Sequence, residues 1–243
     1  MEPAKNLLQI AEEVAACEKC SLHFSRKKSV PGEGPANAKI MLIGEGPGFY
    51  ENEQGRPFVG PSGQFLAELL QSAGLKRPEV FIGNVVKCRP PQNRDPLPDE
   101  LLACRPYLEW QIEVINPEVF ITLGRFSMAH FLPGGKISLI HGKPTWIGDK
   151  LVVPMYHPAA ALHQPALRES VVKDFISLPA ALEQARKYKT VQAPTAPVRP
   201  PMEPQKPAAF DFQQMDKPVE WSPVKEKKET EEDDSGPVQL SLF

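Results

Sequence analysis

Residues 44–63 have the sequence GEGPGFYENEQGRPFVGPSG, which is dense in residues that shape the path of a backbone. The stretch contains six glycines and three prolines. Glycine lets a backbone approach a ligand closely, and proline fixes its course. A strand-to-helix connection needs only about 2–6 residues, so a plain surface loop does not account for this length. We therefore predict a ligand pocket in this stretch.

The flanking segments predict where the pocket lies in the fold. The apolar run at 40–43 indicates a buried parallel strand. Apolar residues recur at helical spacing over 63–73, with Ser62 as the expected N-cap and Gly74 as the expected stop. Ligands of open α/β sheets bind at the carboxyl ends of the strands. The stretch at 44–63 occupies that position.

The rest of residues 1–189 alternates apolar strand patterns with helical ones. We expect further strands at 80–86, 119–123 and 150–155, and helices at 4–16, 98–115, 125–132 and 167–187. Pro106 is expected to kink the helix that contains it or to confine the regular part of that helix to later residues. This alternation predicts a three-layer α/β/α fold around a four-stranded parallel sheet.

The C-terminal part of the chain differs in composition. Residues 190–243 contain nine of the 28 prolines, and their ten acidic residues outnumber six basic ones. So few periodic apolar residues predict disorder. We expect a folded domain over 1–189 and a Pro-rich, charged linker over 190–238.

Targeting signals are not evident in the sequence. The sequence contains no run of 18 apolar residues, so we expect no membrane span. The first residues, MEPAKNLLQIAEEV, lack the basic-then-apolar order of a signal peptide. We expect a cytoplasmic monomer.

The four cysteines predict a metal site. Cys17 and Cys20 form a CxxC pair, and Cys88 and Cys104 flank a Pro-rich loop. In a cytosolic chain, cysteines are more often metal ligands or catalysts than disulfide partners. Their spacing does not separate zinc from an iron–sulfur cluster, and unrelated buried thiols are the alternative. We expect one four-thiolate site with a structural role.

Three further motifs accompany the GEGPG and GRPFVGPSG segments of the first stretch. They are GNVVKCRPPQNR at 83–94, TLGRFSM at 122–128 and MYHPAAAL at 155–162. Together the motifs resemble the family 4 uracil-DNA glycosylases, the iron–sulfur branch, over roughly residues 10–180. The resemblance implies a [4Fe–4S] cluster on the four cysteines and removal of uracil from DNA.

The resemblance also implies roles for pocket residues. A glycosylase must extrude the nucleotide, stack its base, recognise the base edge and stabilise the leaving anion. Phe58 is expected to stack on uracil. The amide of Asn84 is expected to accept N3–H and donate to O4, a pattern that mismatches cytosine. His157 is expected to donate a hydrogen bond to O2 as negative charge develops there.

The remaining expected site residues surround these three. Glu45 is the candidate for orienting the attacking water or offsetting positive charge on the sugar. Glu51 is expected to support the pocket and Asn93 to contact DNA or water. Close backbone contacts to the substrate are expected at Gly44, Gly46 and Gly48.

Other functional classes fit the sequence less well. The GxGxxG dinucleotide fingerprint is absent because position 49 is Phe, and Ser62 lacks a nucleophile-elbow setting. Superfamily relatives that crosslink to DNA use a His in an insertion after the third cysteine, but residues 89–103 contain no His. Turnover is therefore favoured. The alternative is a non-catalytic, cluster-containing DNA-binding or clamp-adaptor protein.

The chain ends in QLSLF, which resembles the peptide by which bacterial repair proteins dock on the sliding clamp. Apolar side chains would enter a groove while the Gln side chain hydrogen-bonds at its edge. A chance apolar end is the alternative. The expected clamp-binding residues are Gln239, Leu240, Ser241, Leu242 and Phe243.

Overall fold

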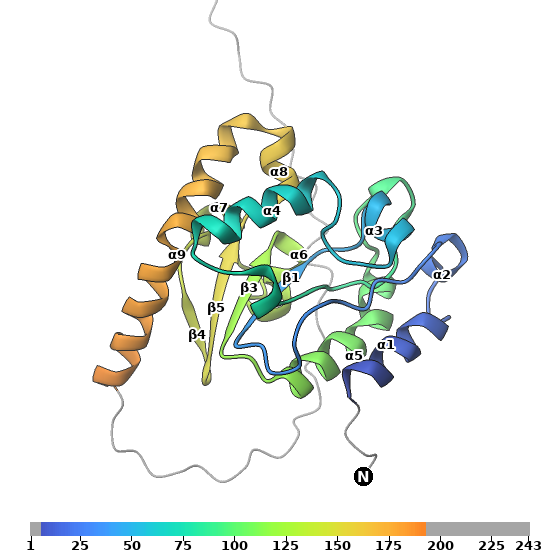
Figure 1. Cartoon of the computed structure of the whole chain (residues 1–243), viewed down its shortest axis with the longest axis horizontal. Coiled ribbons are helices and arrows are strands. Elements are labelled where there is room, and N and C mark those ends of the chain that lie inside the picture. Colours follow the sequence, from blue (N-terminus) through green and yellow to red (C-terminus); the bar gives the residue numbers. More distant parts are fainter. Residues whose placement is uncertain (1–5, 193–243) are drawn as a thin grey trace, which may run out of the picture. The chain divides into compact units, whose positions relative to one another are not determined.

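The computed structural model describes residues 6–192. The predicted linker from 193 onward and the predicted clamp-binding residues 239–243 lie outside this range. Figure 1 shows the strands β1 (Ile40–Gly44), β2 (Phe81–Asn84), β3 (Val119–Leu123), β4 (Thr145–Ile147) and β5 (Lys150–Met155). The helices are α1 (Leu7–Ala16), α2 (Leu22–Ser25), α3 (Phe49–Gln54), α4 (Pro61–Ser72), α5 (Pro98–Ile115), α6 (Arg125–Phe131), α7 (Ile137–Ile140), α8 (Pro158–His163) and α9 (Pro165–Gln192). Two 3-10 turns, Arg77–Glu79 and Pro91–Asn93, complete the order. Within the described range, no helix is long and apolar enough to cross a membrane.

The sheet has five strands in the order β2-β1-β3-β5-β4. The four predicted strands are all parallel, which confirms the predicted core of the fold. The fifth strand, β4, pairs antiparallel with β5 at one edge. The predicted count of four strands was therefore too low, because β4 has only three residues and is shorter than a recognisable strand pattern.

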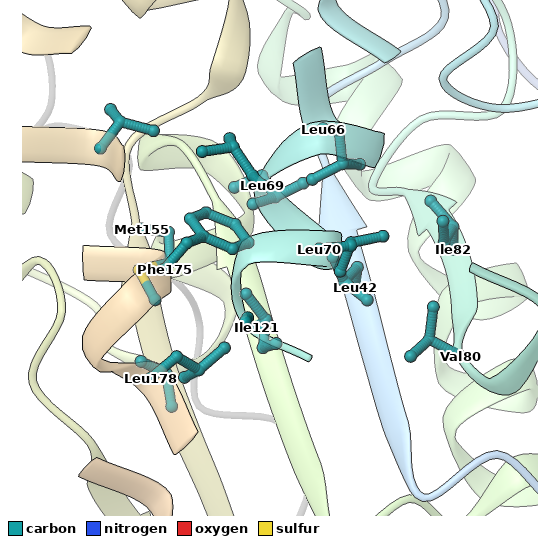
Figure 2. Packing of buried hydrophobic residues seen from close by; sticks show 14 of the residues in the cluster. Leu42, Leu66, Leu69, Leu70, Val80, Ile82, Ile121, Met155, Phe175 and Leu178 are labelled. Atoms are coloured by element: carbon teal, nitrogen blue, oxygen red, sulfur yellow. The ribbon is translucent and has the colours of Figure 1, made fainter. Parts of the chain in front are cut away.

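Two apolar layers enclose the sheet and confirm the three-layer architecture. On one face, leucines of α4 pack over Leu42 and Ile121 beside Phe175 and Leu178 of α9 (Figure 2). On the other face, Met41 and Ile43 pack with residues of α5 and α6. Successive strand residues thus face opposite layers, as the pleat requires. Burial on both faces explains why the strand sequences are continuous apolar runs.

A third apolar group joins α1 to the side of the domain. Helix α1 lies beside α5 (Figure 1). Ile10, Val14 and Leu22 pack there with Val86 and Tyr107. Cys88 and Cys104 are buried in the same group, and Cys17 and Cys20 pack against it. The N-terminal segment is thereby held against the start of α5.

Local details differ from the expected ones at several element ends. Helix α4 begins after Gly60, with Pro61 in its first turn, so Ser62 is inside the helix and is not its N-cap. Proline favours this position because its fixed φ suits a first helical turn. Helix α5 continues through Pro106, although proline removes one backbone hydrogen bond. Helix α9 extends to Gln192, beyond the expected end at 187.

Candidate active site

A cavity of about 390 Å³ opens at the carboxyl ends of β1, β2 and β5. The structure brings eight of the nine expected substrate-site residues together in its lining. They are Glu45, Gly46, Gly48, Glu51, Phe58, Asn84, Asn93 and His157. Segments distant in sequence meet here because parallel strands present their carboxyl ends at one edge of the sheet.

Gly44, the ninth expected residue, lies beneath the cavity and does not line it. A Cβ atom at this position would collide with Asn84 Oδ1 and would lie 2.7 Å from Cζ of Phe58. Real Cβ atoms essentially never approach another atom so closely. Gly44 therefore provides the space in which the Asn84 amide and the Phe58 ring sit.

Phe58 is held in an unusual backbone conformation. Its φ of +49° lies in the left-handed region, which a bulky residue rarely adopts. The Arg77 guanidinium donates hydrogen bonds to the carbonyls of Pro57, at 2.6 Å, and Phe58, at 3.2 Å. The Phe58 ring stacks with the ring of His157, with centroids 5.7 Å apart. The aromatic face is thus fixed before any base arrives.

Glu51 supports this turn from inside the protein. Its Oε1 accepts hydrogen bonds from the backbone N–H groups of Val59, at 2.8 Å, and Gly60, at 2.9 Å. A Cβ atom at Gly48 would lie 2.7 Å from Glu51 Oε2, so glycine makes room for the carboxylate. Glu51 is buried on α3, a short helix that the sequence analysis did not predict. Through these contacts Glu51 holds the backbone of the turn that follows Phe58.

Asn84 presents an unsatisfied polar atom. The residue ends β2 and is 1% exposed. Among the described residues, its Oδ1 has no hydrogen-bond partner. A buried amide oxygen left unpaired costs about 1–3 kcal/mol, so such atoms are rare in folded proteins. The position beside the cavity indicates that a ligand supplies the missing donor.

His157 is neutral and has a defined tautomer. It caps α8, and the backbone N–H of Ala159 donates to its Nδ1 at 3.1 Å. Because Nδ1 accepts, the ring proton of a neutral imidazole is on Nε2. Burial lowers the pKa of His157 to about 4. The side chain therefore offers one N–H donor, from Nε2, at neutral pH.

The carboxyl group of Glu45 has a pKa close to neutral pH. Burial, together with charge repulsion from Asp95, raises the pKa of Glu45 to about 7, against an opposing effect of Arg125. Asp95 and Arg125 themselves form an ion pair. A carboxyl group with a pKa near the working pH exchanges protons readily, which suits acid–base work.

The rim of the cavity contains both an expected and an unexpected residue. Asn93 follows Gln92, and both have left-handed φ angles. Arg89 Nε donates to Asn93 Oδ1 at 2.9 Å. Arg94 also lines the cavity, and it makes two hydrogen bonds, of 2.8 and 2.6 Å, to the buried carboxylate of Glu100. Sequence reasoning missed Arg94 because the QNR segment has no periodic pattern that marks one side chain.

The four cysteines line a second cavity, between α1, α2 and the start of α5. Arg26 Nη1 donates to Cys88 Sγ at 3.4 Å, and the backbone N–H of Lys87 donates to Cys104 Sγ at 3.2 Å. Burial raises the pKa of the Cys104 thiol to about 12. A bound metal or cluster would have to displace that proton.

The four thiols are candidate ligands for a metal group. In residues 6–192, no three His, Cys, Asp or Glu side chains converge as the ligands of one metal ion would. A zinc ion requires four converging ligands, whereas a four-iron cluster binds each thiolate through a different iron atom. The four cysteines line one cavity, so they are the candidate ligands of a shared metal group.

Comparison with known proteins identifies the family of this chain. Residues 31–177 match the model of the uracil DNA glycosylase superfamily. The chain belongs to the uracil-DNA glycosylase superfamily. The matched range includes the complete glycosylase cavity described above.

Within the superfamily, this chain matches type-4 uracil-DNA glycosylases over most of their length. The type-4 uracil-DNA glycosylase of Saccharolobus solfataricus is 49% identical over 187 residues, which are 73% of this chain and 87% of the relative. The Thermotoga maritima enzyme is 45% identical over 170 residues, 68% of this chain and 88% of the relative. The type-5 uracil-DNA glycosylase of Thermus thermophilus is 40% identical over 124 residues, only 43% of this chain and 56% of the relative.

Proposed function

We propose that this chain is a uracil-DNA glycosylase that hydrolyses the N-glycosidic bond of deoxyuridine in DNA. It releases uracil, leaves an abasic site and so begins base excision repair. The observation that carries this conclusion is the unpaired Oδ1 of Asn84, placed beside the ring of Phe58 and the Nε2 donor of His157. The type-4 relatives, at 43–49% identity, support the same activity.

Recognition of uracil follows from the Asn84 amide. An extruded uracil stacks on Phe58, donates its N3–H to Asn84 Oδ1 and accepts a hydrogen bond at O4 from the amide NH₂. Cytosine presents an acceptor at N3 and a donor at the 4-position, so both amide groups would remain unpaired. Each unpaired buried group costs about 1–3 kcal/mol. The enzyme rejects cytosine on this basis.

The leaving group is stabilised by His157. When the bond between C1′ and N1 breaks, its electron pair remains on uracil and negative charge spreads to O2. The neutral imidazole donates Nε2–H to O2 without transferring the proton. A fixed donor in a site that excludes water stabilises the developing charge more than solvent does. The role resembles other neutral imidazole electrophiles.

A water molecule attacks the sugar at C1′. Loss of uracil leaves an oxocarbenium-like C1′, and the oxygen of a water molecule forms the new bond to it. We assign to ionised Glu45 the orientation of this water and the acceptance of its proton. The carboxylate also offsets positive charge on the sugar, so Glu45 serves both expected roles while ionised.

We assign a [4Fe–4S] cluster to Cys17, Cys20, Cys88 and Cys104. Bound there, the cluster would crosslink the N-terminal segment to the start of α5. The four thiols line one cavity, which supports a site that they share. Analysis of iron and sulfide in anaerobically purified protein tests it, together with visible absorption from thiolate–iron charge transfer. A colourless protein that contains zinc would contradict it.

The domain organisation is proposed from the sequence. We assign the catalytic domain to residues 1–189, a linker to 190–238 and clamp docking to Gln239–Phe243, and we expect the monomer to act in the cytoplasm. A tethered enzyme would be concentrated near newly made DNA. Deletion of 239–243 should abolish binding to a bacterial sliding clamp and leave activity on short oligonucleotides unchanged. Clamp affinity that survives the deletion would refute the docking role.

One assay separates catalysis from a binding role. Cluster-loaded full-length protein is incubated with uracil-containing oligonucleotides, and free uracil is measured. We expect uracil release in the wild type and strong loss in Asn84→Asp. Binding that ignores uracil, with no free base, would instead identify the non-catalytic adaptor.

A further inference from the structure

Lys87 is a fully buried lysine beside the active site. It is 1% exposed and is among the largest fully buried side chains of the described chain. Its ammonium group donates to the backbone carbonyl of Asn84 at 2.9 Å and to Gln111 Oε1 at 2.6 Å. Both acceptors are neutral, and none of the ion pairs in residues 6–192 includes Lys87. A buried charge without an opposite charge is costly, so an anionic group is expected nearby.

The other side of Lys87 faces the thiol cavity. Its backbone N–H donates to Cys104 Sγ at 3.2 Å, and the residue that follows it in the chain is Cys88. Lys87 also lines the cavity that the four cysteines share. The same residue therefore contacts the end of β2, where uracil is recognised, and the site assigned to the cluster.

Two further hydrogen bonds keep Lys87 in place. Gln111, on α5, donates from Nε2 to the carbonyl of Pro31 at 2.7 Å. The carbonyl of Lys87 accepts from the N–H of Val30 at 2.8 Å. The ammonium group thus has little freedom to move toward another partner. Because the ammonium group bonds both to the Asn84 carbonyl and to Gln111 of α5, it links the end of β2 to α5.

We propose that Lys87 is a positioning residue that couples the cluster site to base recognition by Asn84. This inference rests on the proposed function and on the assigned cluster. Four thiolates around a four-iron core carry a net negative charge, which the Lys87 ammonium offsets. The ammonium in turn anchors the carbonyl of Asn84, so the amide that faces uracil keeps its orientation. Groups that hydrogen-bond to the ligands of a metal site affect activity by about 10- to 100-fold.

The test uses the full-length, cluster-loaded protein with Lys87→Met, which removes the charge and nearly keeps the volume. We expect kcat for uracil release to fall about 10- to 100-fold with KM little changed, because the orientation of Asn84 matters most in the transition state. We also expect the reduction potential of the cluster, measured by direct electrochemistry, to become more negative. Loss of a nearby cation makes addition of an electron less favourable.

Two other variants provide the comparison. Lys76→Met removes a surface lysine whose ion pair within residues 6–192 is with Glu79, and it should leave both readouts unchanged. Gln111→Leu removes one acceptor but keeps the Lys87 charge, so kcat should fall while the potential stays. If Lys87→Met does not fold or load its cluster, Gln111→Leu decides the positioning role.

The outcomes are separable. Unchanged kcat or unchanged potential in folded Lys87→Met would overturn the coupling, as would full activity in Gln111→Leu. A wild-type protein that releases no uracil would refute the proposed function instead. In that case a shifted potential in Lys87→Met would still support the charge link to the cluster.

Discussion

The backbone N–H of Ala159 donates to Nδ1 of His157 at 3.1 Å, and this contact determines which ring nitrogen has a proton to offer. A histidine that accepts at Nδ1 cannot be protonated there. Burial lowers its pKa to about 4, so the ring stays neutral when Nε2 faces the base. Helix α8 therefore sets the tautomer in which Nε2 is the donor that we propose for the leaving group.

Replacement of His157 by Ala should slow the chemical step. Removal of one oxyanion-type donor lowers kcat by about 10²–10³-fold. Single-turnover measurement of uracil release gives this rate separately from product release. Binding of uracil-containing DNA, measured by fluorescence anisotropy, should change much less. A variant with equal losses in binding and rate would contradict a role specific to the transition state.

The rate should depend on the ionisation of Glu45. Burial raises its pKa to about 7, and the ionised form is the one that orients water and offsets sugar charge. The single-turnover rate should therefore rise with pH up to about 7 and level off above it. Glu45→Gln should lower the rate and remove this dependence. A flat profile in the wild type would exclude Glu45 as the controlling group.

Neighbours of Glu45 should move this profile in opposite directions. Asp95 raises the pKa of Glu45 and Arg125 lowers it. Asp95→Asn should shift the rising limb to lower pH, and Arg125→Gln should shift it to higher pH. These two side chains pair with each other, so the double variant should show a smaller shift than either single one. Shifts of the same sign in both single variants would argue against charge as the cause.

Asn84→Asp should weaken uracil recognition and improve the fit to cytosine, because a carboxylate oxygen accepts from the 4-amino group that cytosine has in place of O4. The new carboxylate cannot donate to O4, and its second oxygen would face an acceptor. Loss of one buried hydrogen bond to the base is worth about 1–3 kcal/mol, or about 5- to 150-fold in rate. The measurement is release of uracil and of cytosine from matched oligonucleotides. Uracil release at the wild-type rate by the variant would contradict the proposed base contacts.

The support under the aromatic ring can be tested by Glu51→Ala. The substitution leaves the N–H groups of Val59 and Gly60 without their acceptor. We expect the free energy of unfolding to fall by about 1–3 kcal/mol and KM to rise because the Phe58 ring is less well held. Glu51→Gln retains one amide oxygen and should be affected less. Urea denaturation and steady-state kinetics give the two quantities.

Much of this fold was predictable because its signals are local. The four parallel strands are continuous apolar runs, and the bounds predicted for α5 agree with Pro98–Ile115. That helix starts at a proline and ends at Asn116, whose φ of +45° stops it. Helix α3 was missed because six residues between two glycines show too little periodicity.

The site was predictable where a motif identifies one residue, and not where the role arises in the folded chain. Asn84 is the last residue of β2, His157 follows β5, and both belong to recognisable motifs. The contacts of Lys87 come instead from Gln111 and Cys104 on a later helix. Arg94 likewise owes its orientation to Glu100. Pattern alone does not show such partners, because pairing in space is set by the packing of α5.

The left-handed backbone of Phe58 has a consequence for affinity. Arg77 and Glu51 restrain this turn in the protein without substrate. Most of the conformational entropy of the segment is therefore lost when the chain folds, not when a base arrives. An extruded nucleotide binds to a loop that is already ordered, so the affinity for the base is not reduced by the entropy cost of ordering this loop.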